Sequence, residues 1–224
     1  MKRVLINGIN GKMGQALKRL IETQPELGLT FAGGRESGET VNFPFDVIID
    51  FSTPQGAQEA FALAKHHRKA FLTGTTNLPE TFLFQMQQEE KIPVFYAPNV
   101  SLSVYFFTQL VKQAAKMYAG YKINLHEIHH VHKKDAPSGT AKNIAAAIGF
   151  PAQEVSYERI GETVGTHSAT FSTPLDEITL THKALNRDLF ADSALHIAKW
   201  LCTCEKGFYT MKDFANFKLK EGKK

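Results

Sequence analysis

The sequence has few of the features that mark secreted, disulfide-stabilised or membrane-spanning proteins. Only two of its 224 residues are cysteines. Cys202 and Cys204 lie two apart in a predicted helix, where such residues point to different sides, so no disulfide is expected between them. Free thiols favour a reducing, cytoplasmic location. The first apolar run, residues 4–6, is too short for a signal peptide, and no run approaches a membrane span, so no membrane partner is expected.

A strong excess of one charge is also missing. The formal net charge is +4, and no long stripe of Lys and Arg precedes the last few residues, so nucleic acid is not an expected partner. A mild positive charge can still attract anionic cofactors and substrates. Hydrophobic residues make up 43% of the chain and charged residues 21%, which is typical of a soluble globular protein with a real core in one or two domains.

The chain begins with a pattern that predicts a dinucleotide-binding turn. A short apolar strand at residues 4–7 and an amphipathic helix at residues 15–23 flank the sequence G-I-N-G-K-M-G. Gly8 would allow a tight turn and Gly11 a close approach of pyrophosphate, while Asn10 replaces the usual middle glycine and tolerates left-handed dihedrals. A purely structural glycine turn is the alternative. The residues of this turn expected to contact the cofactor are Gly8, Asn10, Gly11, Lys12 and Met13.

Short apolar strands and helices then alternate as far as residue 99. Strands are predicted at residues 29–32, 47–51, 70–73 and 94–96, and helices at residues 55–66 and 79–91. This alternation predicts an α/β, Rossmann-type doubly wound parallel sheet, in which ligands bind at the carboxyl ends of the strands. The further residues expected to contact the cofactor there are Phe51, Ser52, Gly74, Thr75, Thr76, Ala97, Pro98 and Asn99.

The end of the second strand bears on the choice of cofactor. An NAD-preferring fold often places an acidic residue there to hold the ribose hydroxyls, but glycine occupies the expected position and Arg35 follows. Arg35, together with Lys12, could pair with a 2′-phosphate. We therefore predict NADPH as the preferred cofactor, with NADH possible.

The second half of the chain has a different pattern of polar and apolar residues. A helix at residues 101–117 precedes a strand at residues 121–128, and three later segments alternate polar and apolar residues with the period of a strand. They predict a second α+β domain with a mixed sheet, one face on helices and one face free to form an oligomer. A further helix is expected at residues 189–202, followed by a frayed basic tail at residues 218–224. The predicted domains are residues 1–99 with 187–224, and residues 100–186.

Residues 126–142, H-E-I-H-H-V-H-K-K-D-A-P-S-G-T-A-K, contain the strongest candidate site. Pro137 favours an extended residue before it and a helix after it, so a helix should begin near Ser138 and end near residue 148. The amides of Ser138, Gly139 and Thr140 would face outward at the positive end of the helix dipole and bind a carboxylate or phosphate. Proton-carrying and cationic side chains lie directly upstream: His129, His130, His132, Lys133 and Lys134. The stretch predicts an active site for an acidic small molecule.

Two other interpretations of this stretch remain open. The histidine run could bind zinc, although no H-E-x-x-H or paired-cysteine pattern accompanies it, and it could also be a solvated basic strand end. His129 and Lys133 would be roughly 13 Å apart in an extended strand. They can therefore act together only if the chain bends between them.

The signature E-x-H-H-x-x-K-x-D-A-P-S-G-T-A, at residues 127–141, resembles that of the 4-hydroxy-tetrahydrodipicolinate reductase (dihydrodipicolinate reductase) family of bacterial lysine and diaminopimelate biosynthesis. The resemblance continues in G-x-x-G-x-M-G, D-F-S-x-P, G-T-T, A-P-N-x-S and G-F-Y-x-M, which start at Gly8, Asp50, Gly74, Ala97 and Gly207. It implies a two-domain subunit, completed at its first domain by the last helix, and a homotetramer formed through the second sheet. Asn77, Ser103 and Tyr105 depart from the family's usual residues.

The resemblance also implies a reaction and roles for the site residues. An NAD(P)H-dependent oxidoreductase would reduce a cyclic dicarboxylate, with His129 as acid and Lys133 stabilising developing charge. One substrate carboxylate would lie against His130, Ser138, Gly139 and Thr140, and no metal is expected. The alternatives are a non-catalytic NADPH-binding redox sensor and a zinc hydrolase. An aspartate-semialdehyde-like dehydrogenase would need a nucleophilic cysteine, which a packed helix around Cys202 does not offer.

Overall fold

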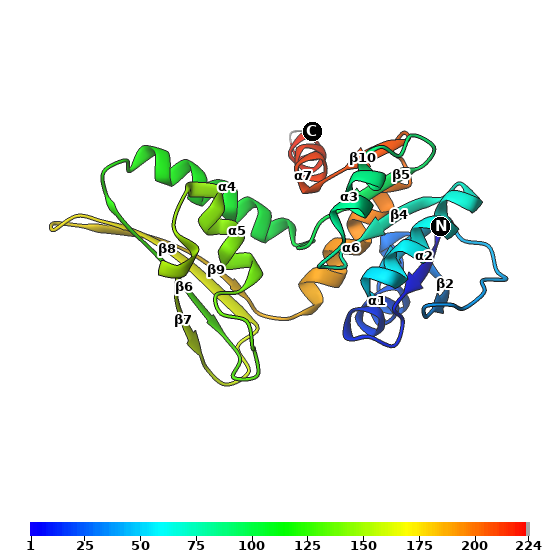
Figure 1. Ribbon diagram of the computed structural model, residues 1–224, viewed down its shortest axis with the longest axis horizontal. Coiled ribbons are helices and arrows are strands. Elements are labelled where there is room, and N and C mark those ends of the chain that lie inside the picture. Colours follow the sequence, from blue (N-terminus) through cyan, green and yellow to red (C-terminus); the bar gives the residue numbers. More distant parts are fainter. Residues whose placement is uncertain (223–224) are drawn as a thin grey trace. The chain divides into compact units, whose positions relative to one another are not determined.

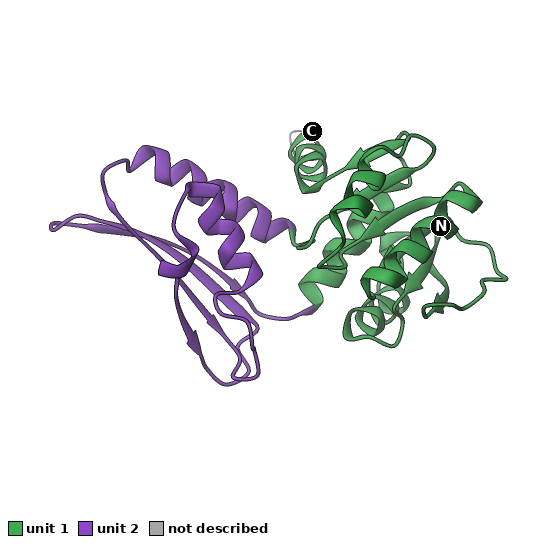
Figure 2. Cartoon of the chain, viewed as in Figure 1, with its two compact units in different colours: residues 1–101, 188–224 green, residues 102–187 purple. Residues whose placement is uncertain are grey.

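The computed structural model describes residues 1–222, and the chain divides into two compact units (Figure 2). Unit 1 comprises residues 1–101 with 188–224, and unit 2 comprises residues 102–187. The divisions predicted from the sequence, after residues 99 and 186, differ from these by two residues and by one. No helix among the described residues is both long enough and apolar enough to cross a membrane.

Unit 1 contains a parallel six-stranded sheet in the order β10-β5-β4-β3-β1-β2 (Figure 1). Its strands are β1 (Lys2–Asn7), β2 (Leu29–Arg35), β3 (Val47–Asp50), β4 (Ala70–Thr73), β5 (Pro93–Tyr96) and β10 (Gly207–Tyr209). The order reverses at β1, because β2 lies on one side of it and β3 on the other. In doubly wound sheets this reversal creates the crevice in which a ligand binds. The predicted parallel sheet is confirmed.

Helices cover both faces of this sheet, which explains why its strands are continuous apolar runs. The helices α2 (Pro54–His67) and α3 (Glu80–Gln87) pack on one face through a core that includes Leu5, Ile48, Phe61 and Phe82. The other face carries α1 (Lys12–Thr23) and α6 (Asp188–Leu201), which contact each other. Burial of a phenylalanine such as Phe61, which is 2% exposed, contributes about 2–3 kcal/mol to stability.

The carboxyl-terminal segment differs from its prediction. Residues 218–221 of the predicted frayed tail belong to α7 (Met211–Glu221), which packs Phe214 and Phe217 against Trp200 at ring distances of 5.3 and 5.8 Å. Asp213 caps this helix by accepting a hydrogen bond from the Thr210 amide at 2.8 Å. Residues 223–224 of the predicted tail lie outside the described residues. This helix has a basic local sequence with no strong helix pattern of its own, and the aromatic packing stabilises it.

The cysteines are also placed differently from the prediction. Helix α6 ends at Leu201, so Cys202 and Cys204 follow it rather than lie within it. Both are free thiols, and burial raises the pKa of each to about 11. At neutral pH they are therefore protonated and weak nucleophiles.

Unit 2 contains a mixed four-stranded sheet in the order β7-β6-β8-β9. Its strands are β6 (Lys122–His129), β7 (Ser156–Arg159), β8 (Gly165–Ser172) and β9 (Glu177–Ala184); β7 is parallel to β6 and the other pairings are antiparallel. The helices α4 (Leu102–Met117) and α5 (Gly139–Ile148) lie on one side of the sheet (Figure 1) and enclose a core with Phe107, Leu125 and Phe171. The predicted second α+β unit with a mixed sheet is confirmed.

Candidate active site

The glycine turn after β1 has the geometry of a nucleotide site. Gly8 has φ 82°, and a Cβ on it would meet the Phe51 carbonyl oxygen at 2.5 Å. A Cβ on Gly14 would meet the Gly8 carbonyl oxygen at 2.3 Å, so both positions require glycine. Helix α1 begins at Lys12, three residues earlier than predicted, with Gly11 as its N-cap. The predicted contacts Asn10, Lys12 and Met13 therefore lie at the positive end of a helix dipole, where pyrophosphate fits.

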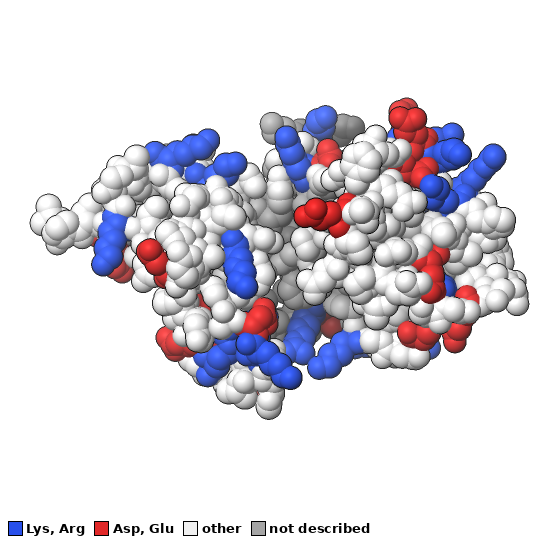
Figure 3. All heavy atoms as spheres, in the orientation of Figure 1, with Lys and Arg blue, Asp and Glu red and all other residues white. Residues whose placement is uncertain are grey.

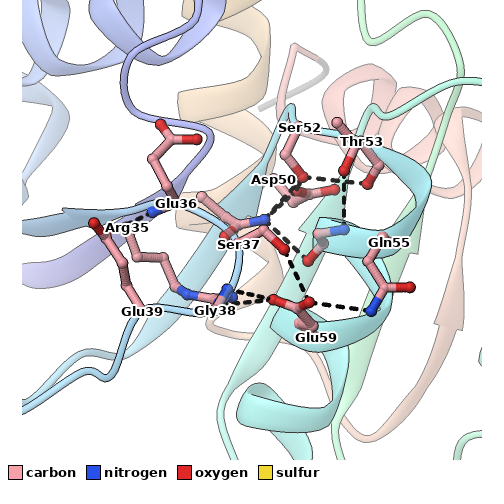
Figure 4. Close-up of polar contacts among 12 residues, drawn as sticks. Arg35, Glu36, Ser37, Gly38, Glu39, Asp50, Ser52, Thr53, Gln55 and Glu59 are labelled. Carbon is pink, nitrogen blue, oxygen red and sulfur yellow. Dashed lines mark hydrogen bonds and ion pairs between the residues drawn. The ribbon is translucent and has the colours of Figure 1, made fainter.

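A buried carboxylate holds the ends of three neighbouring strands together. Asp50 is 0% exposed. Its Oδ1 accepts hydrogen bonds from Asn7 Nδ2 at 2.6 Å and Ser52 Oγ at 2.5 Å, and its Oδ2 accepts from Thr73 Oγ1 at 2.6 Å and Thr75 Oγ1 at 2.7 Å. Figure 4 shows part of this network. Sequence reasoning noted Asp50 only as part of a motif, because nothing local shows that four donors converge on it.

The loops after β3, β4 and β5 place the remaining predicted cofactor contacts at the same edge of the sheet. A Cβ on Gly74 would lie 2.1 Å from the nearest atom of the Phe51 ring, so this position requires glycine as long as the ring stays in place. Thr76 and Pro98 are exposed, whereas Thr75 and Ala97 are buried and offer mainly backbone groups. Asn99 accepts a hydrogen bond from the Ser101 amide at 2.9 Å. Asn77, where the resemblance predicts glycine, has φ 57°, a conformation that asparagine tolerates.

Arg35 does not lie where the sequence analysis placed it. Strand β2 continues three residues beyond its predicted end, and the Arg35 side chain is 5% exposed and paired through Nη2 with Glu59 at 3.1 Å (Figure 4). Glu59 also accepts hydrogen bonds from the Gly38 amide and Ser37 Oγ, both at 2.8 Å. These contacts, led by that of Gly38, lower the pKa of Glu59 to about 2. One guanidinium nitrogen, Nη2, is therefore held by a carboxylate, while Nε and Nη1 are buried without a hydrogen-bond partner among the described residues.

The acidic residue at this strand end is Glu36, which the sequence analysis missed because it ended the strand too early. Its side chain points away from Glu59 in Figure 4. Its Oε1 accepts a hydrogen bond from the Asn10 amide of the glycine turn at 2.9 Å. A carboxylate beside the glycine turn stands where ribose hydroxyls are held in nucleotide sites of this type.

In unit 2, helix α5 begins as predicted, but one amide points inward. Ser138 is the N-cap, and its Oγ accepts from the Ala141 amide at 3.1 Å. The prediction that the Ser138 amide faces outward is wrong, because this amide donates to the buried Glu127 Oε1 at 2.9 Å. Gly139 is exposed with open space around it, and Thr140 is half-buried. The predicted anion-binding site at the start of α5 therefore offers the amides of Gly139 and Thr140 but not that of Ser138.

Glu127 lies at the centre of a buried polar cluster (the Glu127 cluster: Glu127, His129, Ser138, Arg159 and His167). Glu127 is 0% exposed, and its oxygens lie 3.4 Å from His129 Nδ1, 3.6 Å from His167 Nε2 and 3.3 Å from Arg159 Nη2. Residues two apart on a strand share a face, and β-pairing sets His167 directly opposite Glu127 and Arg159 opposite His129. Sequence reasoning missed the His167 and Arg159 contacts, because they depend on which strands pair.

Burial and neighbouring charges lower the pKa values of both Glu127 and His129, which leaves the first ionised and the second neutral. Burial alone would raise the pKa of Glu127, but the His167 ring and the hydrogen bonds of Ser138 lower it to about 2. Burial lowers the pKa of His129 to about 4; Glu127 opposes this shift, while His167, Lys133 and Arg159 add to it. At neutral pH the cluster thus holds an ionised glutamate beside a neutral His129 ring.

The chain bends directly after His129, as joint action with Lys133 requires. The Val131 amide donates to the Gly161 carbonyl at 3.1 Å, and the Lys133 amide donates to the His130 carbonyl at 3.1 Å. The Lys133 ammonium bonds both oxygens of Asp135, at 2.7 and 3.0 Å. Figure 3 shows basic side chains gathered at the end of unit 2 where β6 finishes, with acidic ones beside them. The predicted catalytic pair is thus on one bend of the chain.

The histidine run itself does not gather around one point. Within residues 1–222, the side chains whose ligand atoms converge, all within 4.8 Å of one another, are Glu127, His129 and His167. The guanidinium of Arg159 lies against the same carboxylate and would repel a metal cation. We therefore interpret the cluster as a hydrogen-bonding network. His130 lies on the bend, where partial burial and then the charge of Arg187 lower its pKa.

Comparison with known proteins identifies the family. Family models described as dihydrodipicolinate reductase, N-terminus and C-terminus, match residues 2–100 and 103–215. The chain belongs to the dihydrodipicolinate reductase family. A protein named 4-hydroxy-tetrahydrodipicolinate reductase from Xanthomonas campestris pv. campestris is 40% identical, over 94% of this chain and 96% of the relative. One of the same name from Campylobacter jejuni subsp. jejuni is 34% identical, over 96% and 99%. The predicted family is confirmed.

Solved structures show that this family's fold is the one observed here. A dipicolinate-bound dihydrodipicolinate reductase from Paenisporosarcina sp. TG-14 has a TM-score of 0.74 at 21% identity, covering 94% of this chain and 97% of that one. A C. glutamicum DAP dehydrogenase in complex with DAP has a TM-score of 0.56 at 13% identity, covering 94% and 92%. At these identities the likeness concerns the fold alone.

Proposed function

We propose that this chain is a 4-hydroxy-tetrahydrodipicolinate reductase, which reduces a cyclic dicarboxylate with a nicotinamide nucleotide to give tetrahydrodipicolinate. The relatives of that name, which align with nearly the whole chain, support the activity. The observation that carries the proposal is that unit 2 holds both the side chains that can donate a proton and the helix N-terminus that can bind an anion. His129 and Lys133 flank one bend, and Glu127 ties that strand to the N-terminus of α5 at Ser138.

Each residue of the site then has a physical role. A bound nicotinamide nucleotide supplies the hydride. The Lys133 ammonium stabilises the negative charge that develops on the substrate ring, and His129 gives a proton to it. The Gly139 and Thr140 end of α5, with the Ser138 cap and His130, holds one substrate carboxylate. Because His129 is neutral in the resting protein, a bound dicarboxylate must raise its pKa before it acts as an acid.

Unit 1 would bind the cofactor at the carboxyl ends of its strands, and the contacts there favour NADH. The NADPH prediction depended on Arg35, whose guanidinium is buried against Glu59. Glu36, beside the glycine turn, is suited to accept hydrogen bonds from both ribose hydroxyls and would repel a 2′-phosphate. We infer that NADH is the preferred cofactor.

Replacement of Glu36 tests this cofactor assignment. The wild-type ratio of kcat/KM should favour NADH, and Glu36→Gln should lower kcat/KM for NADH about tenfold while leaving that for NADPH unchanged or higher. Glu26→Gln, at an exposed position of unit 1, is the matched control and should change neither value. A wild-type preference for NADPH that Arg35→Ala abolishes would restore the prediction made from the sequence.

A coupled assay tests the activity itself. Pyruvate, aspartate semialdehyde and the upstream synthase supply the substrate, and oxidation of the nicotinamide cofactor is followed. His129→Gln and Lys133→Ala should lower turnover by roughly two to four powers of ten. His126→Gln, on the opposite face of β6 against Ser156, should keep wild-type turnover. Cofactor binding without oxidation would favour the redox-sensor alternative, and near-normal rates in both site variants would refute the residue roles.

We further propose that the protein is a cytoplasmic homotetramer assembled through the open face of the unit 2 sheet. That face presents hydroxyl pairs, Ser168 with Thr181 at 3.0 Å and Thr170 with Thr179 at 2.9 Å, and no helix of the unit covers it. Light scattering after size exclusion should give four times the chain mass of 25.0 kDa. Thr179→Glu should dissociate the assembly, whereas a tetramer that survives it would place the interface elsewhere.

A further inference from the structure

The Glu127 cluster contains two buried polar atoms that face each other, and the carboxylate atom also lies 3.6 Å from His167 Nε2. Glu127 Oε2 and His129 Nδ1 are both shielded from solvent, and within the described residues neither makes a well-aligned hydrogen bond. They lie 3.4 Å apart. Leaving both unpaired would be costly, so a small rotation that closes an Nδ1–H···Oε2 hydrogen bond is favoured.

The other ring nitrogen of His129 faces a position that contains no side chain. A Cβ on Gly165 would lie 3.0 Å from His129 Nε2, so a side chain at position 165 would crowd this nitrogen and glycine avoids that contact. One nitrogen of the ring thus faces a fixed carboxylate, while the other has a glycine beside it. This is the arrangement that fixes a histidine tautomer in proton-transfer sites.

Glu127 also connects the proton carrier to the anion-binding site. Its Oε1 accepts from the Ser138 amide at 2.9 Å, and its Oε2 faces His129. The other charged or titratable groups around His129 are Arg159 on β7, His167 on β8 and Lys133 on the bend. Glu127 supplies the one negative charge among the named groups that shift the pKa of His129, and it acts in the direction opposite to the other three.

We propose that Glu127 is a positioning residue that holds His129 as the Nδ1–H tautomer, so that Nε2 is the atom that carries the proton to substrate. The proposal rests on the proposed role of His129. The proton given to the substrate leaves from Nε2, and the ring returns to the neutral Nδ1–H form. Glu127 stays ionised throughout and takes no proton.

Removal of the Glu127 charge should lower the pKa of His129. Glu127 raises the pKa of His129 against burial and against three positive or neutral neighbours. In Glu127→Gln the His129 pKa should therefore fall further. If turnover needs protonated His129 in the complex, kcat falls as pH rises through its pKa there, and this limb should move to lower pH by about one unit.

The matched control is Glu158→Gln. Glu158 is a 54% exposed carboxylate on β7 that pairs with His126 at 3.3 Å, and it does not contact His129. The substitution removes the same charge from the same unit. Its kcat, KM and pH profile should be those of the wild type, whereas Glu127→Gln should lower kcat by about ten- to a hundredfold at pH 8.

Nitrogen-15 NMR of histidine-labelled wild-type protein supplies a second measurement that does not depend on a Glu127 variant. The His129 signal, assigned by its loss in His129→Gln, should report protonated Nδ1 and unprotonated Nε2 at pH 8. An Nε2–H tautomer, or a pH limb that does not move in folded Glu127→Gln, would overturn the proposal. If His129→Gln instead retains activity, the catalytic role of His129 fails, while the tautomer measurement still tests its pairing with Glu127.

Discussion

Replacement of Asp50 tests whether one carboxylate organises the cofactor edge of unit 1. Asp50 accepts four side-chain hydrogen bonds, and its donors come from the ends of β1 and β4 and from the loops after β3 and β4. In Asp50→Ala the buried hydroxyls of Thr73 and Thr75 lose their acceptor, whereas the half-buried Ser52 hydroxyl keeps the Thr53 carbonyl at 3.4 Å. The Asn7 amide is less affected, because it also donates to the Gly56 carbonyl at 3.1 Å.

The expected loss in the free energy of unfolding depends on how many of those hydroxyls lose their acceptor. Each buried hydroxyl left without an acceptor costs about 1–2 kcal/mol, so the two threonine hydroxyls cost about 3 kcal/mol in Asp50→Ala. Asp50→Asn keeps one oxygen acceptor and the side-chain volume, so its cost should be about half of that, near 1.5 kcal/mol. A loosened strand edge should also weaken cofactor binding about tenfold, because the loops that contact the nucleotide begin at these residues.

Urea unfolding followed by tryptophan fluorescence measures this cost. Trp200, the single tryptophan of the chain, lies on α6 and packs against α7 in unit 1, and it therefore reports on that unit. Asp192→Asn, which removes an exposed carboxylate 3.8 Å from His196 on α6, is the control and should cost less than about 0.5 kcal/mol. A loss below about 1 kcal/mol in Asp50→Ala would refute the network as the organising element.

Three further predictions concern the glycine turn, acid stability and metal content. Gly14→Ala sets a Cβ 2.3 Å from the Gly8 carbonyl and should weaken cofactor binding in titration calorimetry by about a hundredfold, whereas Gly222→Ala, with 3.8 Å to its nearest neighbour, should not. Because folding lowers the pKa of His129 from 6.5 to about 4, stability is full above pH 6.5 and falls on acidification towards pH 4, by up to about 3 kcal/mol. Thermal melts should show this fall, and His129→Gln should flatten it; the depressed pKa of Glu127 continues the loss from pH 4.5 towards 2. Plasma mass spectrometry of purified protein should find far less than one zinc per chain, and a stoichiometric metal would contradict the network interpretation.

Local patterns predicted much of this protein because they act over short distances. The spacing of apolar residues and glycines in residues 4–23 predicts strand, turn and helix, since each depends on neighbours a few positions away. Pro137 and Ser138 predict the start of α5 for the same reason, and helix capping at Ser138 bears it out. The positions of Gly8 and Gly14 follow equally from local sterics, because a Cβ at either would strike the backbone.

Short or weakly patterned segments were predicted less well. Strand β10 has only three residues, too few for a period to appear, and it forms only because β5 offers a free edge. Helix α7 has a basic sequence that resembles a tail, and its stability comes from aromatic packing against Trp200. In both cases contacts with other parts of the fold, and not the local sequence, stabilise the element.

The sequence by itself determined the family and the two-sheet architecture, because the short-range patterns of strands and helices agree with one long family signature. It also predicted the residues that we propose carry the chemistry. Only the tertiary structure decided their partners: Arg35 is neutralised by Glu59, the Ser138 amide turns inward to Glu127, and His167 lies opposite Glu127. These contacts join residues 11 to 40 positions apart. Which strands pair, and in which register, depends on the packing of the whole unit, so no local pattern specifies it.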